Sequence, residues 1–131
     1  MTRIDVRTER REQLVDVTAR VSDALRASGV REGWALVFCP HTTAGVTINE
    51  NADPDVVTDV LEALRRIAPR DAGYRHAEGN SDGHLKASLV GSSVTVPISE
   101  WRLVLGTWQA VYFCEFDGPR SRSLLVTTLG N

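Results

Sequence analysis

Alternating and periodic apolar positions divide the first fifty residues into strands and one helix. Residues 3–8, RIDVRT, alternate polar and apolar side chains as a half-buried strand does. Apolar residues in 17–29 recur at helical spacing, and Gly29 stands where a helix C-terminal cap belongs. Residues 34–39, WALVFC, and 44–49, AGVTIN, predict two further strands.

The strongest helix signal follows directly after these strands. Asp53 can cap a helix, Pro54 suits its first turn, and Asp55 favours the positive end of its dipole. An apolar stripe continues until Pro69 ends the helix, and it consists of Val57, Val60, Leu61, Leu64 and Ile67. This pattern predicts an amphipathic helix.

The second half of the chain is rich in strands. Residues 71–83 are polar and glycine-rich and predict a loop, and 84–91 predict a helical turn closed by Gly91. Three strand-like runs follow, joined by short turns, at 93–98, 102–116 and 121–129. Short turns favour antiparallel pairing, so we expect a single α+β domain over residues 1–131, with a sandwich-like sheet and two principal helices.

The turn between the first two of these runs lacks a glycine. Its residues are Ser99, Glu100 and Trp101. A tight primed turn needs positive φ angles, which tryptophan resists. We therefore expect this turn to be irregular or longer than two residues.

Composition and charge exclude two classes of partner. The 131 residues carry a net charge of −2 and no basic run, which argues against nucleic acid. The charged N-terminal stretch lacks a signal-peptide pattern, and no run reaches the roughly 18 apolar residues of a membrane span. We expect a cytoplasmic protein with no membrane partner. Its two cysteines, Cys39 and Cys114, would be reduced, and we interpret both as small buried hydrophobic residues.

Three histidines are the first candidates for chemistry. His41 follows an apolar strand, whereas His76 and His84 flank the polar loop AEGNSDG. Converging imidazoles would bind a borderline transition metal and leave positions open for water or substrate. The spacing matches no local metal motif, and spacing alone favours three surface or hydrogen-bonded histidines.

Other polar residues admit two interpretations each. Glu50 is either a general base or a partner of an imidazole, and Gln109 is either solvent-facing or a placed hydrogen-bonding group. The stretch CEFDGPRSRS places Glu115, Arg120 and Arg122 around one turn. These residues form either surface ion pairs or an arginine site for phosphate or carboxylate.

Together these motifs resemble the YjbQ-like family, small proteins often labelled secondary thiamine-phosphate synthases. The matching stretches are HTTAGVTINENADPDVVTDVL, YRHAEGNSDGHLKASLVGSSVTVPI and RLVLGTWQAVYFCEFDGPR, together with the last strand. The resemblance covers nearly everything after Trp34. It implies a homotrimer whose histidines, His41, His76 and His84 here, surround a metal, and it makes the metal site the favoured interpretation. The family pattern also includes Glu50, Gln109, Glu115 and Arg120, which we take as catalytic candidates.

Three functions follow from this resemblance and from the candidate site. The family label implies an enzyme that joins a pyrimidine-methyl diphosphate to a thiazole phosphate and releases pyrophosphate. The alternatives are a metal-dependent hydrolase acting on a small phosphorylated substrate and a non-catalytic metal- or ligand-binding trimer. Three imidazoles favour a divalent transition metal such as zinc, and a diphosphate substrate would favour magnesium. A small phosphorylated molecule is therefore the expected partner, besides the other subunits of the trimer.

Overall fold

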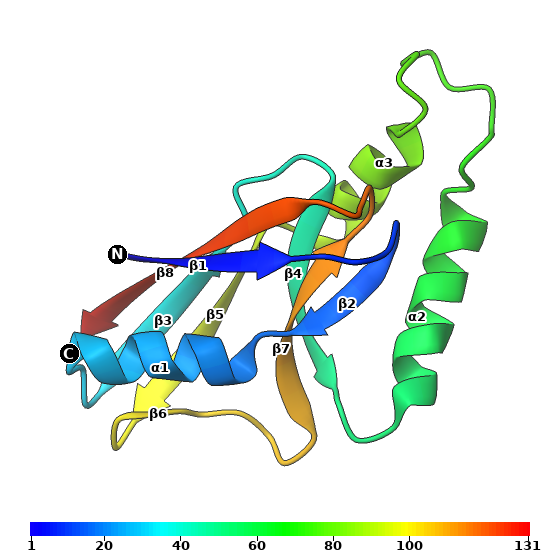
Figure 1. Cartoon of the computed structure of the whole chain (residues 1–131). Helices are drawn as coiled ribbons and strands as arrows, with labels where there is room; N and C mark the ends of the chain where they lie inside the picture. The colour runs from blue at the N-terminus through cyan, green and yellow to red at the C-terminus, as the bar shows by residue number, and fades with distance from the viewer.

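The computed structural model describes all 131 residues, which form two antiparallel sheets and three helices (Figure 1). The five-stranded sheet has the order β1 (Thr2–Arg7), β8 (Ser121–Gly130), β3 (Gly33–Phe38), β5 (Ser93–Ser99), β6 (Arg102–Leu103). The three-stranded sheet has the order β2 (Gln13–Asp16), β7 (Gln109–Glu115), β4 (Ala44–Glu50). The helices are α1 (Thr18–Ser28), α2 (Pro54–Ile67) and α3 (Ser81–Val90).

The core lies between the two sheets and beneath α1. Its buried side chains come from seven elements, and they include Val6, Val21, Val37, Val46, Val96, Phe113 and Leu124. In β1 the alternation of the sequence is realised directly, because Ile4 and Val6 are buried while their neighbours face outward. The predicted α+β class with antiparallel pairing is confirmed, whereas the homotrimer stays a prediction.

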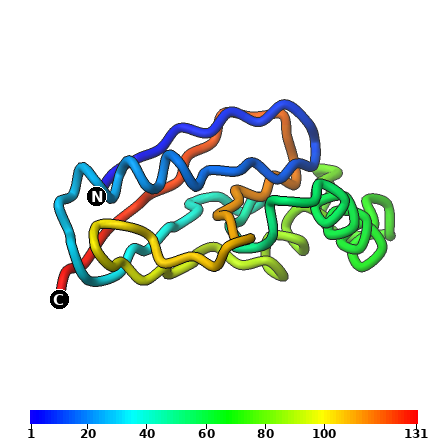
Figure 2. Tube along the Cα trace, turned by 90° about the horizontal axis from the view of Figure 1, so that it is seen from below, coloured from blue at the N-terminus to red at the C-terminus, as the bar shows by residue number.

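Helix α2 lies beside the three-stranded sheet, at one end of the molecule (Figure 2). Asp53 caps it as predicted, since its Oδ1 accepts a hydrogen bond of 2.9 Å from the Asp55 N–H. Part of the predicted stripe, Val57, Leu61 and Leu64, packs on a small cluster in β7, but no residue of α2 is fully buried. Ile67, the last member of that stripe, remains 66% exposed.

Helix α3 corrects the prediction of only two principal helices. It has ten residues and starts at Ser81, inside the segment predicted to be a loop. Its buried residues are Ser81, Asp82, Gly83 and Lys86, so its inward face is polar. A hydrophobic periodicity is therefore absent, and sequence patterns based on apolar spacing do not detect such a helix.

Three further predictions differ from the structure. The run 102–116 is two strands, β6 and β7, separated by an irregular segment, and β2 was not predicted. The turn after β5 is a tight two-residue turn, because Ser99 pairs with Arg102 and the φ angles of Glu100 and Trp101 are 51° and 60°. The expectation of an irregular turn is therefore wrong.

None of the three helices has the length and apolar character needed to cross a membrane.

Candidate functional site

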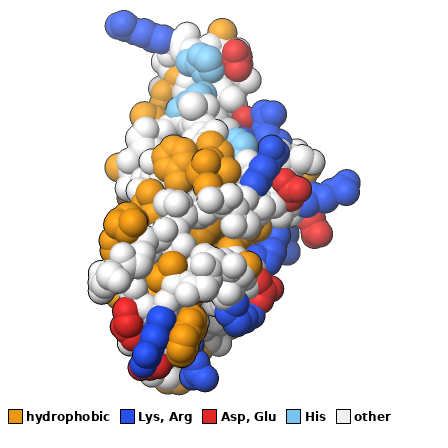
Figure 3. All heavy atoms as spheres, turned by 90° about the vertical axis from the view of Figure 1, so that its left-hand side faces the viewer, with side chains coloured by type: hydrophobic (Ala, Val, Ile, Leu, Met, Phe, Trp, Pro, Cys, Tyr) orange, Lys and Arg blue, Asp and Glu red, His pale blue; other side chains and the backbone are white.

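Two of the three histidines meet at α3. His84 lies on α3 and His76 on the loop before it, and their ring centroids are 5.3 Å apart with the rings nearly perpendicular. Histidine side chains gather towards one end of the face shown in Figure 3, with hydrophobic side chains beside them. The sequence argument that His76 and His84 flank a functional loop is thus consistent with their contact in the fold.

His84 stands between two hollows of the surface. One, of about 390 Å³, is lined by His41 and His84 together with Thr42, Ser88 and Ser92. The other, of about 350 Å³, is lined by His84 and by His76, Tyr74, Arg75, Ser81 and Leu85. The three histidines therefore share one region, although His41 and His76 lie on different sides of His84.

His41 is held in a defined orientation by the backbone of β8. Its Nε2 accepts a hydrogen bond of 3.0 Å from the Ser123 N–H, and its ring lies edge-on to Phe113 at 6.4 Å. Burial and the nearby Arg122 guanidinium lower the pKa of His41 below its ordinary value. A neutral imidazole is also what the bond to Ser123 requires, because only an unprotonated Nε2 can accept it.

The first turn of α3 opens towards the hollow that contains His76. Asn80 precedes the helix but its side chain makes no capping hydrogen bond. The Ser81 hydroxyl is buried and has no hydrogen-bond partner, although buried polar atoms are normally paired. Free amide groups at a helix N-terminus attract anions, and Arg75 adds a positive charge to the same hollow.

The histidines do not form a three-ligand metal site within this chain. The chain contains no group of three or more histidine, cysteine or acidic side chains placed to hold a metal ion. The Nε2 atom of His41 is occupied by the Ser123 N–H, and Cys39 and Cys114 are buried free thiols whose pKa is raised by burial. The donor set of one chain therefore does not fit the predicted site, and binding of a divalent ion stays a prediction.

A network of buried charges anchors α3 from its inward side. Lys86, which is 1% exposed, lies 2.8 Å from Asp82 Oδ2 and 2.8 Å from Glu12 Oε2. Arg11 contacts Asp82 Oδ1 at 3.0 Å and Asp117 Oδ1 at 3.3 Å. The α3 segment that carries His84 is therefore tied to the β1–β2 connection and to the turn after β7.

Glu115 and Arg120 are both bonded to neighbouring groups in the folded chain. Glu115 is fully buried, and its Oε1 accepts hydrogen bonds from Arg122 Nε at 2.9 Å and from the Thr8 hydroxyl at 2.7 Å. Burial raises its pKa, but these donors outweigh burial, and the pKa lies below the ordinary value. Arg120 binds Asp117, with 2.8 Å to its backbone oxygen and 2.9 Å to Oδ2.

Glu50 and Gln109 lie at the other end of the three-stranded sheet. They are cross-strand partners in the β4–β7 pair, whereas Glu115 pairs with Ala44 at the opposite end. Six residue steps of about 3.3 Å put roughly 20 Å between Glu50 and Glu115. Gln109 stabilises a local turn, because its Oε1 accepts a 2.8 Å hydrogen bond from the Gly106 N–H. The structure thus separates these two candidates from the histidines.

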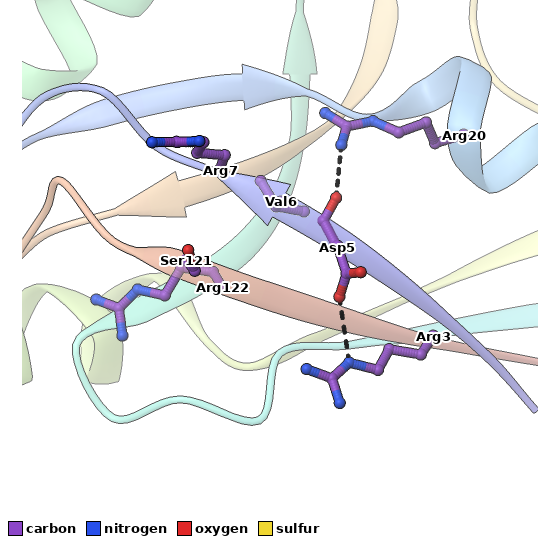
Figure 4. Close-up of a pocket in the computed structure, with 7 residues that line it drawn as sticks. All are labelled: Arg3, Asp5, Val6, Arg7, Arg20, Ser121 and Arg122. Carbon is purple, nitrogen blue, oxygen red and sulfur yellow. Dashed lines mark hydrogen bonds and ion pairs between the residues drawn. The ribbon is translucent and has the colours of Figure 1, made fainter.

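A third hollow, polar and lined largely by arginines, lies along the edge strand β1 (Figure 4). Arg3 and Arg20 lie on opposite sides of Asp5, with Arg20 Nη1 2.8 Å from the Asp5 backbone oxygen and Arg3 Nε 3.3 Å from Asp5 Oδ1. The side chains of Arg3 and Asp5 are 70% and 87% exposed, and such surface pairs contribute little energy. Charges along an edge strand hinder pairing with another chain, and we assign the hollow to that role.

Sequence reasoning missed the residues that anchor the histidine helix. Asp82 lies in the stretch that the sequence predicts to be a polar loop, yet its side chain is buried. The spacing of Asp82 and Lys86, four residues apart, was the available signal, since such pairs meet on one helix face. Ser81, Arg11 and Glu12 carried no local signal, because their roles depend on contacts between distant segments.

Comparisons with known proteins agree along almost the whole chain. The family described as UPF0047 protein YjbQ-like matches residues 2–131. A UPF0047 protein of Methanocaldococcus jannaschii is 48% identical over 126 residues, covering 96% of this chain and 91% of the relative. The UPF0047 protein YugU of Bacillus subtilis is 47% identical over 128 residues, with 97% of each chain covered.

Solved structures of similar proteins share this fold. A crystal structure of an uncharacterized conserved protein of the YjbQ/UPF0047 family from Clostridium acetobutylicum has a TM-score of 0.97 and 50% identity, covering 98% of this chain and all of the other. A YbjQ-like protein of unknown function from Sulfolobus solfataricus has a TM-score of 0.95 and 34% identity, covering 99% and 96%.

These findings correct the functional prediction. The relatives are named only as UPF0047 proteins or as proteins of unknown function, and nothing in them indicates thiamine-phosphate synthesis. The predictions of a synthase or other transferase, and of a zinc-dependent activity, are therefore without support. The metal-based alternatives lack a ligand set in this chain as well.

Proposed function

The chain belongs to the UPF0047 YjbQ-like family, and for this member we propose that the face containing His41, His76 and His84 binds a small phosphorylated molecule and exchanges protons with it. One observation carries the proposal: His84 forms a wall of two adjoining hollows, one containing His41 and the other His76 and Ser81. A ligand seated there would contact all three imidazoles.

The chemistry of the second hollow supports an anion as the bound group. The Ser81 hydroxyl is buried without a partner, the first turn of α3 has no side-chain cap, and Arg75 lines the same hollow. Phosphate oxygens accept hydrogen bonds from helix amides, hydroxyls and guanidinium groups, and the positive end of the helix dipole favours the charge.

The paired imidazoles support proton exchange as the activity. His76 and His84 lie with ring centroids 5.3 Å apart, so a ligand can reach both. Imidazole serves as a general acid and as a general base, so one ring can donate a proton while the other accepts one. His41 is kept neutral by burial and by Arg122, and its Nε2 accepts from the Ser123 N–H, so its Nδ1 carries the proton and can only donate a hydrogen bond to the ligand.

Self-association in the cytoplasm belongs to the same proposal. Trp34, Phe38 and Leu129 are 37%, 40% and 56% exposed on β3 and β8, which are neighbouring strands of one sheet. Exposed apolar side chains gathered on one face are typical of protein interfaces, and a homotrimer would cover them. Both cysteines are free thiols, which is consistent with a reducing compartment.

The proposal can be tested by titrating inorganic phosphate and methyl phosphate into isotope-labelled protein. We expect the imidazole resonances of His76 and His84 to shift together and saturably. Ser81→Ala should weaken binding about tenfold, which corresponds to the loss of one hydrogen bond to a charged group. Arg70→Gln, a loop arginine outside both hollows, is the matched control and should leave the affinity unchanged.

Two results would reject the proposal. One is the absence of a saturable shift at either imidazole with both phosphates. The other is an equal loss of affinity in Ser81→Ala and Arg70→Gln, which would indicate a diffuse effect of surface charge. A proton-exchange role further requires that the pH dependence of any turnover change when His84 is replaced by glutamine.

A further inference from the structure

The tight turn between β5 and β6 holds two side chains in an unfavourable backbone conformation. Glu100 and Trp101 have φ angles of 51° and 60°, in the left-handed region that glycine and asparagine normally occupy. A residue with a β-carbon is strained there, and a bulky aromatic residue is rare. Glycine at position 101 would form the same turn without this cost, so the indole has to be explained by its contacts.

Contacts from residues 31 and 32 hold the turn in place. The Arg31 guanidinium lies over the Trp101 ring at 5.1 Å and pairs with Glu100 at 2.8 Å. Glu32 Oε1 accepts hydrogen bonds from the Glu100 N–H at 3.1 Å and from the Ser99 hydroxyl at 3.2 Å. The backbone N–H of Trp101 donates a hydrogen bond of 3.1 Å to the Arg31 backbone oxygen. The indole is therefore fixed in orientation although it is 49% exposed.

Trp101 forms part of a groove between α1 and the segment that begins with β6. The groove has a volume of about 440 Å³. Its apolar part consists of the buried Leu25 and the half-buried Leu103 and Leu105, and α1 contributes the hydroxyl groups of Thr18 and Ser22. An apolar surface with a few polar groups is the usual composition of a small-molecule site.

The remaining lining residues give the groove a positive charge. Both are arginines, Arg26 and Arg102. Arg26 is paired with Asp23 on α1. Arg102 takes part in none of the ion pairs of the chain. An unpaired guanidinium beside an apolar groove complements a ligand that carries one carboxylate, sulfonate or phosphate group.

We propose that this groove is a binding site for a small molecule with a planar apolar body and one anionic group. The planar body stacks on Trp101 and covers Leu103 and Leu105, while Arg102 pairs with the anion. The strain at positions 100 and 101 is retained because it places the indole in the wall of the groove. This site is separate from the histidine face and shares none of its lining residues.

The probes are naphthalene-1-sulfonate and its uncharged analogue 1-naphthalenemethanol. Each is titrated into labelled protein while the three tryptophan indole N–H resonances are followed. We expect naphthalene-1-sulfonate to shift the Trp101 resonance saturably. Trp101→Gly should weaken its binding about tenfold while leaving the melting temperature unchanged or higher, because the strain is relieved. Trp108→Gly is the matched control: Trp108 is 61% exposed, lies outside the groove, and should not affect binding.

Arg102→Gln tests the charge without touching the turn conformation. It should weaken the sulfonate about fivefold and leave the binding of 1-naphthalenemethanol unchanged. The proposal is wrong if Trp101→Gly binds the sulfonate as tightly as the parent protein. It is equally wrong if the probe shifts Trp34 or Trp108 in place of Trp101, which would indicate adsorption on an exposed apolar face.

Discussion

Replacing Lys86 by methionine should destabilise the protein by about 3 kcal/mol. The change removes the ammonium group that the Asp82 and Glu12 carboxylates share beneath α3. The Lys86 ammonium lies 2.8 Å from both Asp82 and Glu12 and is 1% exposed. Breaking a buried ion pair by removing one partner costs about 3–5 kcal/mol. We expect the lower end of this range, since Asp82 keeps Arg11 at 3.0 Å and Glu12 keeps Arg65 at 2.6 Å.

The pH dependence of this loss has a defined sign. Burial raises the pKa values of Asp82 and Glu12, but hydrogen bonds from Lys86 outweigh burial and hold both below their ordinary values. A carboxyl with a lowered pKa in the folded state stabilises above its unfolded pKa and loses this contribution as the pH falls through the folded pKa. Lys86→Met raises both pKa values, so the difference from the parent protein should be largest near pH 7 and shrink towards acid.

Urea unfolding at pH 7 and at pH 4 measures both effects. For 131 residues, about 3 kcal/mol also corresponds to a fall in melting temperature of roughly 10 °C. Adding Asp82→Asn to Lys86→Met should recover at least about 1 kcal/mol of the free energy of unfolding, because one buried charge is removed. Arg70→Gln, at an exposed position, serves as the control. A loss below about 1 kcal/mol, or one that grows towards acid, would refute this account of the network.

Three other predictions concern separate parts of the molecule. The His41 imidazole should titrate below the ordinary value of about 6.5, and protonation should break its bond to the Ser123 N–H; an NMR titration at or above that value would contradict the geometry. Asp53→Ala should cost about 1 kcal/mol in urea unfolding by removing the cap of α2, and an unchanged midpoint would show that the cap is redundant. Light scattering should give the mass of a homotrimer, and a monomer at micromolar concentration would disprove that assembly.

Local patterns predicted those parts of the fold that depend on nearby residues. The Asp53 cap, the helix after Pro54 and the strands β3 and β4 followed from spacing and from turn chemistry, and the structure has them. Strand β2 was missed because none of its four residues is buried and because it pairs with β7, about a hundred residues later. No local rule signals such a partner.

The sequence named the candidate residues, but it could not predict how the fold arranges them. The three histidines lie in one region of the surface. A three-histidine metal site needs all three rings to point at one ion, and within a single chain they are not placed to do so. Glu115 was a catalytic candidate because the family pattern includes it, and in the fold it is buried against Arg122. The turn at Trp101 violated a general rule, and the contacts from Arg31 and Glu32 that hold it in place come from a distant part of the chain that no local pattern signals.

The strand order of the larger sheet has a consequence for synthesis in the cell. Strand β8, at residues 121–130, is the last along the chain, yet it lies between β1 and β3 and pairs with both. While a ribosome is still making the preceding residues, β1 has no neighbour and β3 has β5 alone, so both expose unpaired backbone edges. Such edges favour aggregation, and contacts distant in sequence form slowly. Closure of this sheet must therefore follow translation of residues 121–130, and chaperone contact with the nascent chain should persist until then.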